Sequence, residues 1–250
     1  MEYICINSPS LSGYQTYSST MPFWKRTIDI TCCLLAMPIL GVCTLFVAII
    51  TNLVAPGPIL FKQERIGYQG KRFKIYKFRT MHVAADTGIH QSYFKDLMQT
   101  NVPMTKLDAI GDKRLIPLGW IFRATGLDEL PQLLNVLRGE MSLVGPRPCI
   151  PSEYEEYLPW QRERVNATPG LTGLWQVSGK NRTTFDEMVR FDIKYARNVA
   201  LGQDIKIILG TIPALFQQVG DTVKKRKSTS TAASAQIGSL PKQTNPASNR

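Results

Sequence analysis

The segment FWKRTIDITCCLLAMPILGVCTLFVAIITNLVAPGPILF, residues 23–61, decides the architecture of this chain. Residues 30–50 carry no charged side chain, and a helix of about 21 residues is long enough to cross a bilayer. A run of this length exceeds the apolar core of a signal peptide. We therefore predict a membrane helix over residues 23–55, whose aromatic and basic first residues lie at the membrane interface.

Two features of this helix bear on how it sits in a membrane. Pro38 removes one backbone hydrogen bond and predicts a kink inside the helix. Lysines and arginines flank the helix on both sides, and the positive-inside rule would keep both flanks in the cytoplasm. A re-entrant helix, which enters and leaves through one face, satisfies both observations. A simple crossing stays open, because proline is common in spanning helices.

The composition restricts the class of protein and of partner. The chain has 250 residues, of which 44% are hydrophobic, and this suits one domain with a packed core. Its formal charge of +11 predicts an acidic partner, which is nucleic acid, anionic lipid or a phosphorylated metabolite. The five cysteines show no paired spacing, so neither a disulfide framework nor a zinc site is expected. A reducing, cytosol-facing setting fits best.

The chain divides into four segments by composition. We expect a disordered polar N-terminus, the membrane helix, a single mixed α/β, helix-rich domain and a disordered basic tail. Their bounds are residues 1–22, 23–55, 56–217 and 218–250. Residues 60–79 carry alternating apolar and basic side chains, which predict a cationic strand or hairpin. Residues 205–212 predict an amphipathic surface helix that packs on the core or lies on a membrane.

The stretch GLDELPQLLNVLRGEMSLVGPRP, residues 126–148, combines two adjacent carboxylates with a rigid turn. The leucine spacing predicts a helix with Asp128 at or just before its first turn. The helix dipole would keep Asp128 ionised, as a carboxylate nucleophile requires, and would also attract phosphate. Arg123 and Arg147 would supply the positive charge at the phosphate, and Glu129 would bind or orient Mg²⁺. The plain alternative is that Asp128 caps a helix and that GPRP is a structural turn.

Other catalytic motifs are missing from the sequence. The two histidines, His82 and His90, lie in no recognisable catalytic motif, so a Ser-His-Asp or Cys-His mechanism is not expected. The chain holds no GxSxG or GxGxxG, and GYQGKR has two residues between its glycines where a P-loop needs four. It also lacks the Asp-x-Asp pair with which many nucleotide-sugar glycosyltransferases hold a metal. The adjacent acids Asp128 and Glu129 are therefore the leading candidate for a reaction centre.

Four segments in order resemble the bacterial sugar transferase family, the monotopic phosphoglycosyl transferases that begin exopolysaccharide and glycan assembly. The segments are KRTIDI, PGPILFKQERIGYQGKRFKIYKFRTM, LDELPQLLNVLRGEMSLVGPRP and PGLTGLWQVSGKNR. With the spacing between them they cover roughly residues 23–217. Met37 precedes Pro38 where some relatives have a serine. That difference bears on the sharpness of the kink and leaves the chemistry unchanged.

The resemblance implies an enzyme of the bacterial cytoplasmic (inner) membrane, with its catalytic domain on the cytosolic face. Such enzymes transfer a sugar-1-phosphate from a UDP-sugar to undecaprenyl phosphate, release UMP and require Mg²⁺. The resemblance further implies that Asp128 attacks the sugar-side phosphate and forms a covalent aspartyl-phosphosugar intermediate, while Glu129, beside Asp128, is associated with the metal. The residues that it implies in substrate binding are Arg123, Arg147, Pro146, Pro148, Lys77 and Arg79.

Two other interpretations stay open at this point. One is a membrane glycosyltransferase that moves the sugar alone and releases UDP, and the missing Asp-x-Asp argues against it. The other is a non-catalytic, membrane-anchored binder of anionic lipids, which would not need an acid pair beside GPRP. The expected partners are a UDP-sugar, undecaprenyl phosphate and bacterial membrane lipids, without nucleic acid. The sequence selects neither the sugar nor the polysaccharide product, and it leaves a homo-oligomer open.

Overall fold

The computed structural model describes residues 21–82, 97–98, 100, 102–104 and 114–238. The predicted disordered N-terminus, residues 1–22, therefore lies outside the described residues except for its last two positions. Residues 239–250 of the predicted tail also lie outside them. The described elements, with 3-10 helices labelled η, are α1 (Phe23–Val54), β1 (Leu60–Ile66), η1 (Tyr68–Gly70), β2 (Arg72–Phe78), α3 (Gly119–Thr125), η3 (Leu127–Gln132), α4 (Leu133–Leu137), β3 (Ser142–Val144), α5 (Pro151–Glu155), η4 (Gln161–Asn166), β4 (Gly170–Thr172), α6 (Leu174–Val177), η5 (Lys180–Arg182), α7 (Phe185–Arg197) and α8 (Leu201–Gly238).

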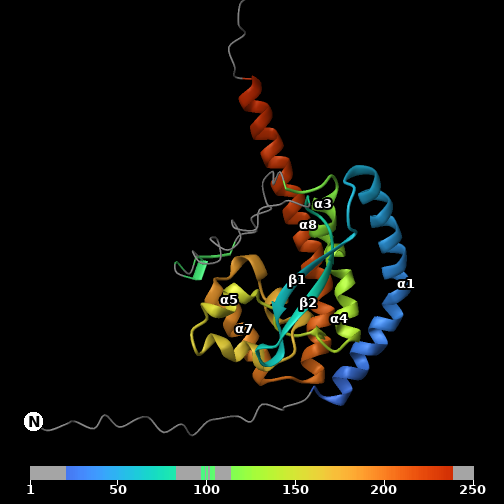
Figure 1. Ribbon diagram of the computed structural model, residues 1–250. Coiled ribbons are helices and arrows are strands. Elements are labelled where there is room, and N and C mark those ends of the chain that lie inside the picture. Colours follow the sequence, from blue (N-terminus) through green and yellow to red (C-terminus); the bar gives the residue numbers. More distant parts are fainter. Residues whose placement is uncertain (1–20, 83–96, 99, 101, 105–113, 239–250) are drawn as a thin grey trace, which may run out of the picture.

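α1 is a single curved helix along the outside of the protein (Figure 1). It is long and apolar enough to cross a membrane, and it is the one helix of the described residues that meets this test. Pro38 lies inside α1, and helical residues continue on both sides of it. The predicted N-terminal apolar helix is thus confirmed, while its re-entrant topology stays a prediction.

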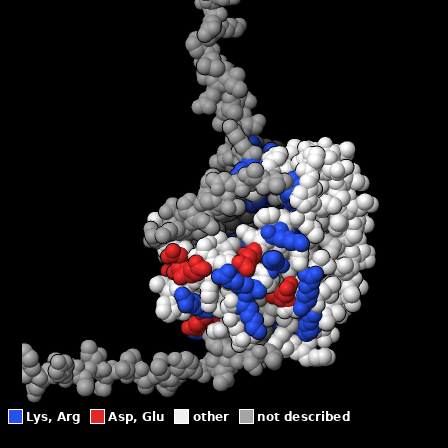
Figure 2. All heavy atoms as spheres, in the orientation of Figure 1, with Lys and Arg blue, Asp and Glu red and all other residues white. Residues whose placement is uncertain are grey.

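Only one side of α1 packs on the rest of the protein. Its buried contacts come from Cys33, Leu40 and Val47, which are spaced by two helical turns and join the core formed with β2 and α4. The surface over α1 shows no charged side chain in Figure 2. An apolar surface of this extent needs lipid or another apolar partner. The large apolar side chains that α1 exposes are Phe23, Ile30, Leu34, Leu35, Ile39, Val42, Leu45, Phe46, Ile49, Leu53 and Val54.

The predicted cationic hairpin is confirmed. β1 and β2 pair antiparallel, in a register that runs from Leu60 opposite Phe78 to Ile66 opposite Arg72. The turn between them is η1, where Gly70 adopts a positive φ of 76°. Ile75 and Phe78 of β2 lie in the core, Lys74 is exposed, and Lys77, which alternation puts on the same face as Ile75, is partly buried. The hairpin crosses the middle of the molecule in Figure 1 and carries Lys77 toward η3.

The second sheet consists of two three-residue strands, β3 and β4, that pair parallel. Three clusters of buried side chains surround the two sheets. One joins α1, β2, α3 and α4, another joins α6 and α7 to the end of β1, and the third lies between β3, α7 and α8. α7 begins with a capping box, in which Thr184 and Glu187 each accept a backbone hydrogen bond from the other. The expected mixed, helix-rich fold is confirmed, and its sheets are small, with two strands each.

α8 is longer than the sequence pattern predicted. It continues to Gly238, whereas a disordered tail was expected from residue 218; residues 221–237 contain neither glycine nor proline, so no helix breaker stops it. Its C-terminal half extends beyond the body of the protein (Figure 1). In the predicted amphipathic segment, residues 205–212, the buried contact is made by Ile207, next to Ile208, which packs partly against the core. The large apolar side chains that α8 exposes are Leu201, Ile205, Leu209, Ile212, Leu215 and Phe216.

Candidate active site

The acid pair lies on η3, a short 3-10 helix between α3 and α4. α3 ends at Thr125, and Gly126 takes a left-handed conformation with φ 73° that reverses the chain into η3. Asp128 and Glu129 occupy the first turn of η3, as predicted, and Asp128 is 8% exposed. The alternative in which Asp128 is the N-cap residue is wrong, because Gly126 holds that position. Asp128 is instead an acid of the first turn.

β2 brings a lysine onto the second acid. Lys77 Nζ donates to Glu129 Oε1 at 2.7 Å. Asn135 fixes β2 to α4, the helix that directly follows η3, and its side chain is fully buried. Its amide accepts from the Tyr76 backbone N–H at 3.2 Å and donates to the Lys74 carbonyl at 2.7 Å. The backbone directly before Lys77 is therefore pinned to α4, the helix that follows the acid pair.

The GPRP turn follows β3 and packs against the PGLTG segment around β4. Gly145 N–H donates to the Thr172 carbonyl, and Gly170 N–H donates to the Pro146 carbonyl, both at 2.9 Å. The two backbones approach so closely that a Cβ on Gly145 would lie 2.2 Å from the Thr168 carbonyl oxygen. Only glycine allows this approach. The two motifs, far apart in sequence, thus form one rigid support for Arg147.

The electrostatics of the site connect these pieces. Loss of hydration raises the pKa of Glu129, but Lys77, Lys180 and Arg147 outweigh it and lower that pKa to about 2. Burial lowers the pKa of Lys180, and the positive charges of Arg147 and Lys77 lower it further. The carboxylates of Glu129 and Asp128 raise that pKa, but its net shift is downward. These mutual effects mean that three cations lie within electrostatic range of the acid pair. We name Lys77, Arg147 and Lys180 the cation cluster.

Lys180 is the member of the cation cluster that sequence analysis missed. It lies in η5, and its Nζ donates to Gln218 Oε1 of α8 at 2.6 Å. Gln218 in turn donates to the carbonyls of Arg123 at 3.1 Å and Ala124 at 2.9 Å, at the end of α3. The only sequence signal was the GKNR end of PGLTGLWQVSGKNR. No local pattern pairs that lysine with Glu129, which lies 51 positions earlier.

The other predicted ligands lie in different parts of the fold. Arg123 is on the last turn of α3, directly before η3, and Pro146 and Pro148 flank Arg147 in the GPRP turn. Arg79 lies apart. Its side chain is 5% exposed, with Nε donating to the Pro58 carbonyl at 2.7 Å and Nη2 to the Ala55 carbonyl. It therefore ties the end of β2 to the segment that follows α1.

The acid pair fits Mg²⁺ in one particular way. Mg²⁺ takes oxygen ligands and is commonly held by one or two carboxylates together with substrate phosphates. Asp128 and Glu129 supply two carboxylates, and the low pKa of Glu129 keeps it ionised. Within the part of the chain that the structure describes, no group of three or more His, Cys, Asp or Glu side chains is able to hold a metal. The donor set thus suits a metal shared with a phosphorylated substrate.

The first turns of α1 are attached to the strand that precedes GPRP. Lys25 is 4% exposed, and its Nζ donates to Asp204 Oδ2 at 2.6 Å and to the Val144 carbonyl at 2.8 Å. Asp29 accepts from the backbone N–H of Leu143 at 2.9 Å. Both residues belong to the segment directly before the apolar run. The start of the membrane helix and the GPRP turn therefore share one buried polar attachment.

Known proteins resemble the chain over most of its length. The family model described as bacterial sugar transferase matches residues 20–218. A galactosyl transferase, CpsE, of Streptococcus agalactiae is 39% identical over 223 residues, which are 84% of this chain and 48% of that protein. The exopolysaccharide production protein ExoY of Sinorhizobium fredii is 38% identical over 191 residues, 76% of this chain and 84% of that protein.

A third relative carries the most explicit name. The UDP-glucose:undecaprenyl-phosphate glucose-1-phosphate transferase of Caulobacter vibrioides is 40% identical over 200 residues, 77% of this chain and 69% of that protein. The chain thus spans about half the length of CpsE and a larger share of the other two proteins. The names of these relatives include both galactosyl and glucose-1-phosphate transfer.

Proposed function

The chain belongs to the bacterial sugar transferase family, and on this premise we propose that it transfers a sugar-1-phosphate from a UDP-sugar to undecaprenyl phosphate and releases UMP. The name of the Caulobacter vibrioides relative supports this class of donor, acceptor and transferred group. The reaction would begin the assembly of an exopolysaccharide or related glycan; the name of ExoY refers to exopolysaccharide production.

The observation that carries the proposal is the acid pair beside three cations. A carboxylate nucleophile must approach a phosphate that is itself negative, so positive charge is needed around the reacting phosphorus. Lys77, Arg147 and Lys180 supply it within electrostatic range of Glu129. A membrane-anchored lipid binder would need diffuse surface charge and not a partly buried cluster aimed at two acids.

The chemistry takes two displacement steps. A carboxylate oxygen of Asp128 attacks the phosphorus that bears the sugar, a new P–O bond forms, and the bond to the UMP oxygen breaks. An oxygen of the undecaprenyl phosphate then attacks the same phosphorus, and the Asp128 carboxylate is released. The incoming lipid phosphate is already an anion, so no base has to remove a proton. Asp128 needs to be ionised for this attack, and it lies in the first turn of η3, beyond the N-cap residue Gly126.

Mg²⁺ is part of the proposal. Asp128 and Glu129 would hold it together with phosphate oxygens of the donor, and the metal would neutralise charge on the leaving UMP. Lys77 holds the Glu129 carboxylate at 2.7 Å and so fixes the direction in which its free oxygen points. Arg147 and Lys180 would bind the phosphates of the donor or the lipid.

We place the reaction at the cytosolic face of the inner membrane, with α1 as a re-entrant anchor. The apolar outer surface of α1 suits the hydrocarbon region, and the exposed apolar side chains of α8 suit the interface of the same membrane. Single-cysteine variants near residues 22 and 70 should both react with an impermeant reagent from the cytosolic side. Labelling from opposite sides would mean that α1 crosses the bilayer.

The function is tested by the products of the purified, lipid-reconstituted chain. With a UDP-sugar and undecaprenyl phosphate we expect UMP and a lipid-linked phosphosugar, and loss of both in Asp128→Asn. Asp221→Asn is a matched control, because Asp221 is an exposed acid on α8. Release of UDP with a sugar on the lipid would instead identify a glycosyltransferase. No turnover of any UDP-sugar by the wild type would remove the proposal altogether.

A further inference from the structure

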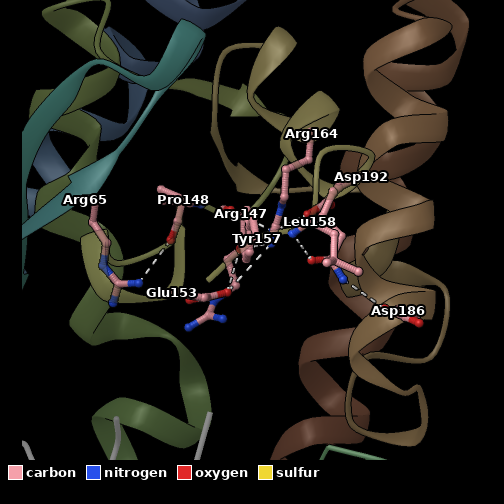
Figure 3. A network of polar contacts seen from close by, with 10 residues as sticks. Arg65, Arg147, Pro148, Glu153, Tyr157, Leu158, Arg164, Asp186 and Asp192 are labelled. Atoms are coloured by element: carbon pink, nitrogen blue, oxygen red, sulfur yellow. Dashed lines mark hydrogen bonds and ion pairs between the residues drawn. The ribbon is translucent and has the colours of Figure 1, made fainter. Parts of the chain in front are cut away.

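A fully buried arginine lies directly behind the GPRP turn (Figure 3). Arg164 of η4 has a side chain that is 1% exposed, and it forms an ion pair with Asp192 of α7. Its Nη1 donates to the Tyr157 hydroxyl at 2.6 Å, and its Nη2 donates to the Arg147 carbonyl at 3.0 Å. Glu153 lies 3.7 Å from the same guanidinium. One buried cation therefore contacts two acids, a hydroxyl and the backbone of GPRP.

A second arginine holds the same turn from the other side. Arg65 of β1 donates to the Pro148 carbonyl at 3.0 Å, and the backbone N–H of Ile66 donates to the Cys149 carbonyl at 2.9 Å. With Arg164 on the Arg147 carbonyl, three consecutive carbonyls are held. Figure 3 shows Arg65 and Arg164 approaching the turn from different elements. The peptide that carries Arg147 is thus fixed on both sides.

The energetics explain why an arginine stands at position 164. A buried cation is costly unless it is paired, and Asp192 supplies the pair. Packing alone would be served by an apolar side chain of similar volume. The guanidinium offers five N–H donors in a rigid plane, and these serve Asp192, Tyr157 and the Arg147 carbonyl together. If apolar side chains replaced both Arg164 and Asp192, no buried charge would be left unpaired, but the hydrogen bond to the Arg147 carbonyl would be lost.

We propose that Arg164, held in place by Asp192, is a positioning residue that acts on the reaction through Arg147. By fixing the Arg147 carbonyl it sets the origin of the Arg147 side chain, which lies within electrostatic range of Glu129 and Lys180. The inference rests on the proposed function, in which Arg147 binds a phosphate. A misplacement of about 1 Å in such a group costs about 100-fold in rate.

The test is a double-mutant cycle between Arg164 and Arg147, read by UMP release. Arg164→Lys keeps the charge for Asp192, but one ammonium does not reproduce the planar set of donors. We expect kcat to fall about 10- to 100-fold in Arg164→Lys. In an Arg147→Ala background the same substitution should change the rate less than about twofold, because the residue through which it acts is gone. Equal falls in both backgrounds would overturn the inference, as would a normal rate in Arg164→Lys.

A second variant separates positioning from stability. Arg164→Met with Asp192→Leu removes both charges and retains apolar volume, so the melting temperature should stay near or above that of Arg164→Met alone. The rate should nevertheless stay low, because no donor reaches the Arg147 carbonyl. Full recovery of the rate together with the melting temperature would show a purely structural role.

The control is an exposed ion pair between the same two elements. Arg197 of α7 contacts Glu163 of η4 at the surface, so Arg197→Lys should leave the rate unchanged. Hydrogen exchange gives a readout that does not need turnover. The amides of Gly145, Arg147 and Cys149 should exchange faster in Arg164→Lys than in the wild type or Arg197→Lys; Pro146 and Pro148 carry no amide hydrogen. Unchanged exchange in Arg164→Lys would contradict the positioning role, whether or not the wild type releases UMP. Absence of UMP release by the wild type would contradict the proposed function.

Discussion

The Gly145→Ala substitution probes how firmly the GPRP turn must be seated. The structure leaves no room for the added methyl group, because a Cβ would lie 2.2 Å from the Thr168 carbonyl oxygen and 2.7 Å from the Gly170 nitrogen. Both neighbours are backbone atoms that cannot rotate away. An ordinary contact begins near 3.4 Å, so the turn and the PGLTG segment must separate by about 1 Å.

The size of the effect follows from this displacement. Overpacking of this kind costs about 1–3 kcal/mol of folding free energy. For a domain of this size that corresponds to a fall of about 2–12 °C in melting temperature. The rate should fall further than stability suggests, by about 100-fold, because Arg147 moves with the turn. Stability and rate are thus predicted to separate in this variant.

The assay combines thermal unfolding with UMP release in the same lipid preparation. Gly202→Ala is the control, because a Cβ at Gly202 has nothing within 4 Å and this helical position favours alanine. It should keep the wild-type rate and an equal or slightly higher melting temperature. A Gly145→Ala protein with wild-type rate and melting temperature would refute the close approach of the two motifs.

Three further substitutions test the attachment of α1 and the charges of the site. Lys25→Met leaves Asp204 without its buried cation and should lower stability by about 3–5 kcal/mol; Lys25→Met with Asp204→Leu should recover most of this in thermal unfolding, and equal losses would contradict the ion pair. Lys77→Met removes the nearest cation from Glu129, so its pKa should rise from about 2 and the acid limb of kcat/KM should move to higher pH; a stationary limb would show that Glu129 does not have to be ionised. Because the pKa of Lys180 is lowered, its charge is lost earlier as pH rises, and Lys180→Arg should move the alkaline limb of kcat/KM upward; no movement would remove Lys180 from the reaction.

Local patterns predicted those parts of the fold in which neighbouring residues decide the structure. The uncharged run of residues 30–50 gave α1, and the alternation in residues 60–79 gave the β1–β2 hairpin. Leucine spacing placed Asp128 in a first turn, although the helix starts as a 3-10 helix capped at Gly126. In each case the signal lies within one element, where helix or strand periodicity acts.

Contacts between distant residues could not be predicted in this way. β3 and β4 have three residues each, too few for a strand pattern, and their pairing depends on close approach of Gly145 and Gly170. Lys180 joins the site only because η5 and α8 fold back on α3, and Arg164 meets Asp192 across 28 positions. Arg79 resembled a phosphate ligand in sequence, but folding gives its donors to carbonyls near the end of α1.

The central claim is that Asp128 becomes covalently bound to the phosphosugar, and one measurement tests it directly. The chain is mixed with a UDP-sugar labelled at the β-phosphate, without acceptor lipid, and the protein is separated and digested. We predict label on the peptide that contains Asp128, release of UMP in equal amount, and loss of both in Asp128→Asn. Release of UDP with an unlabelled protein, or label that persists in Asp128→Asn, would contradict the account.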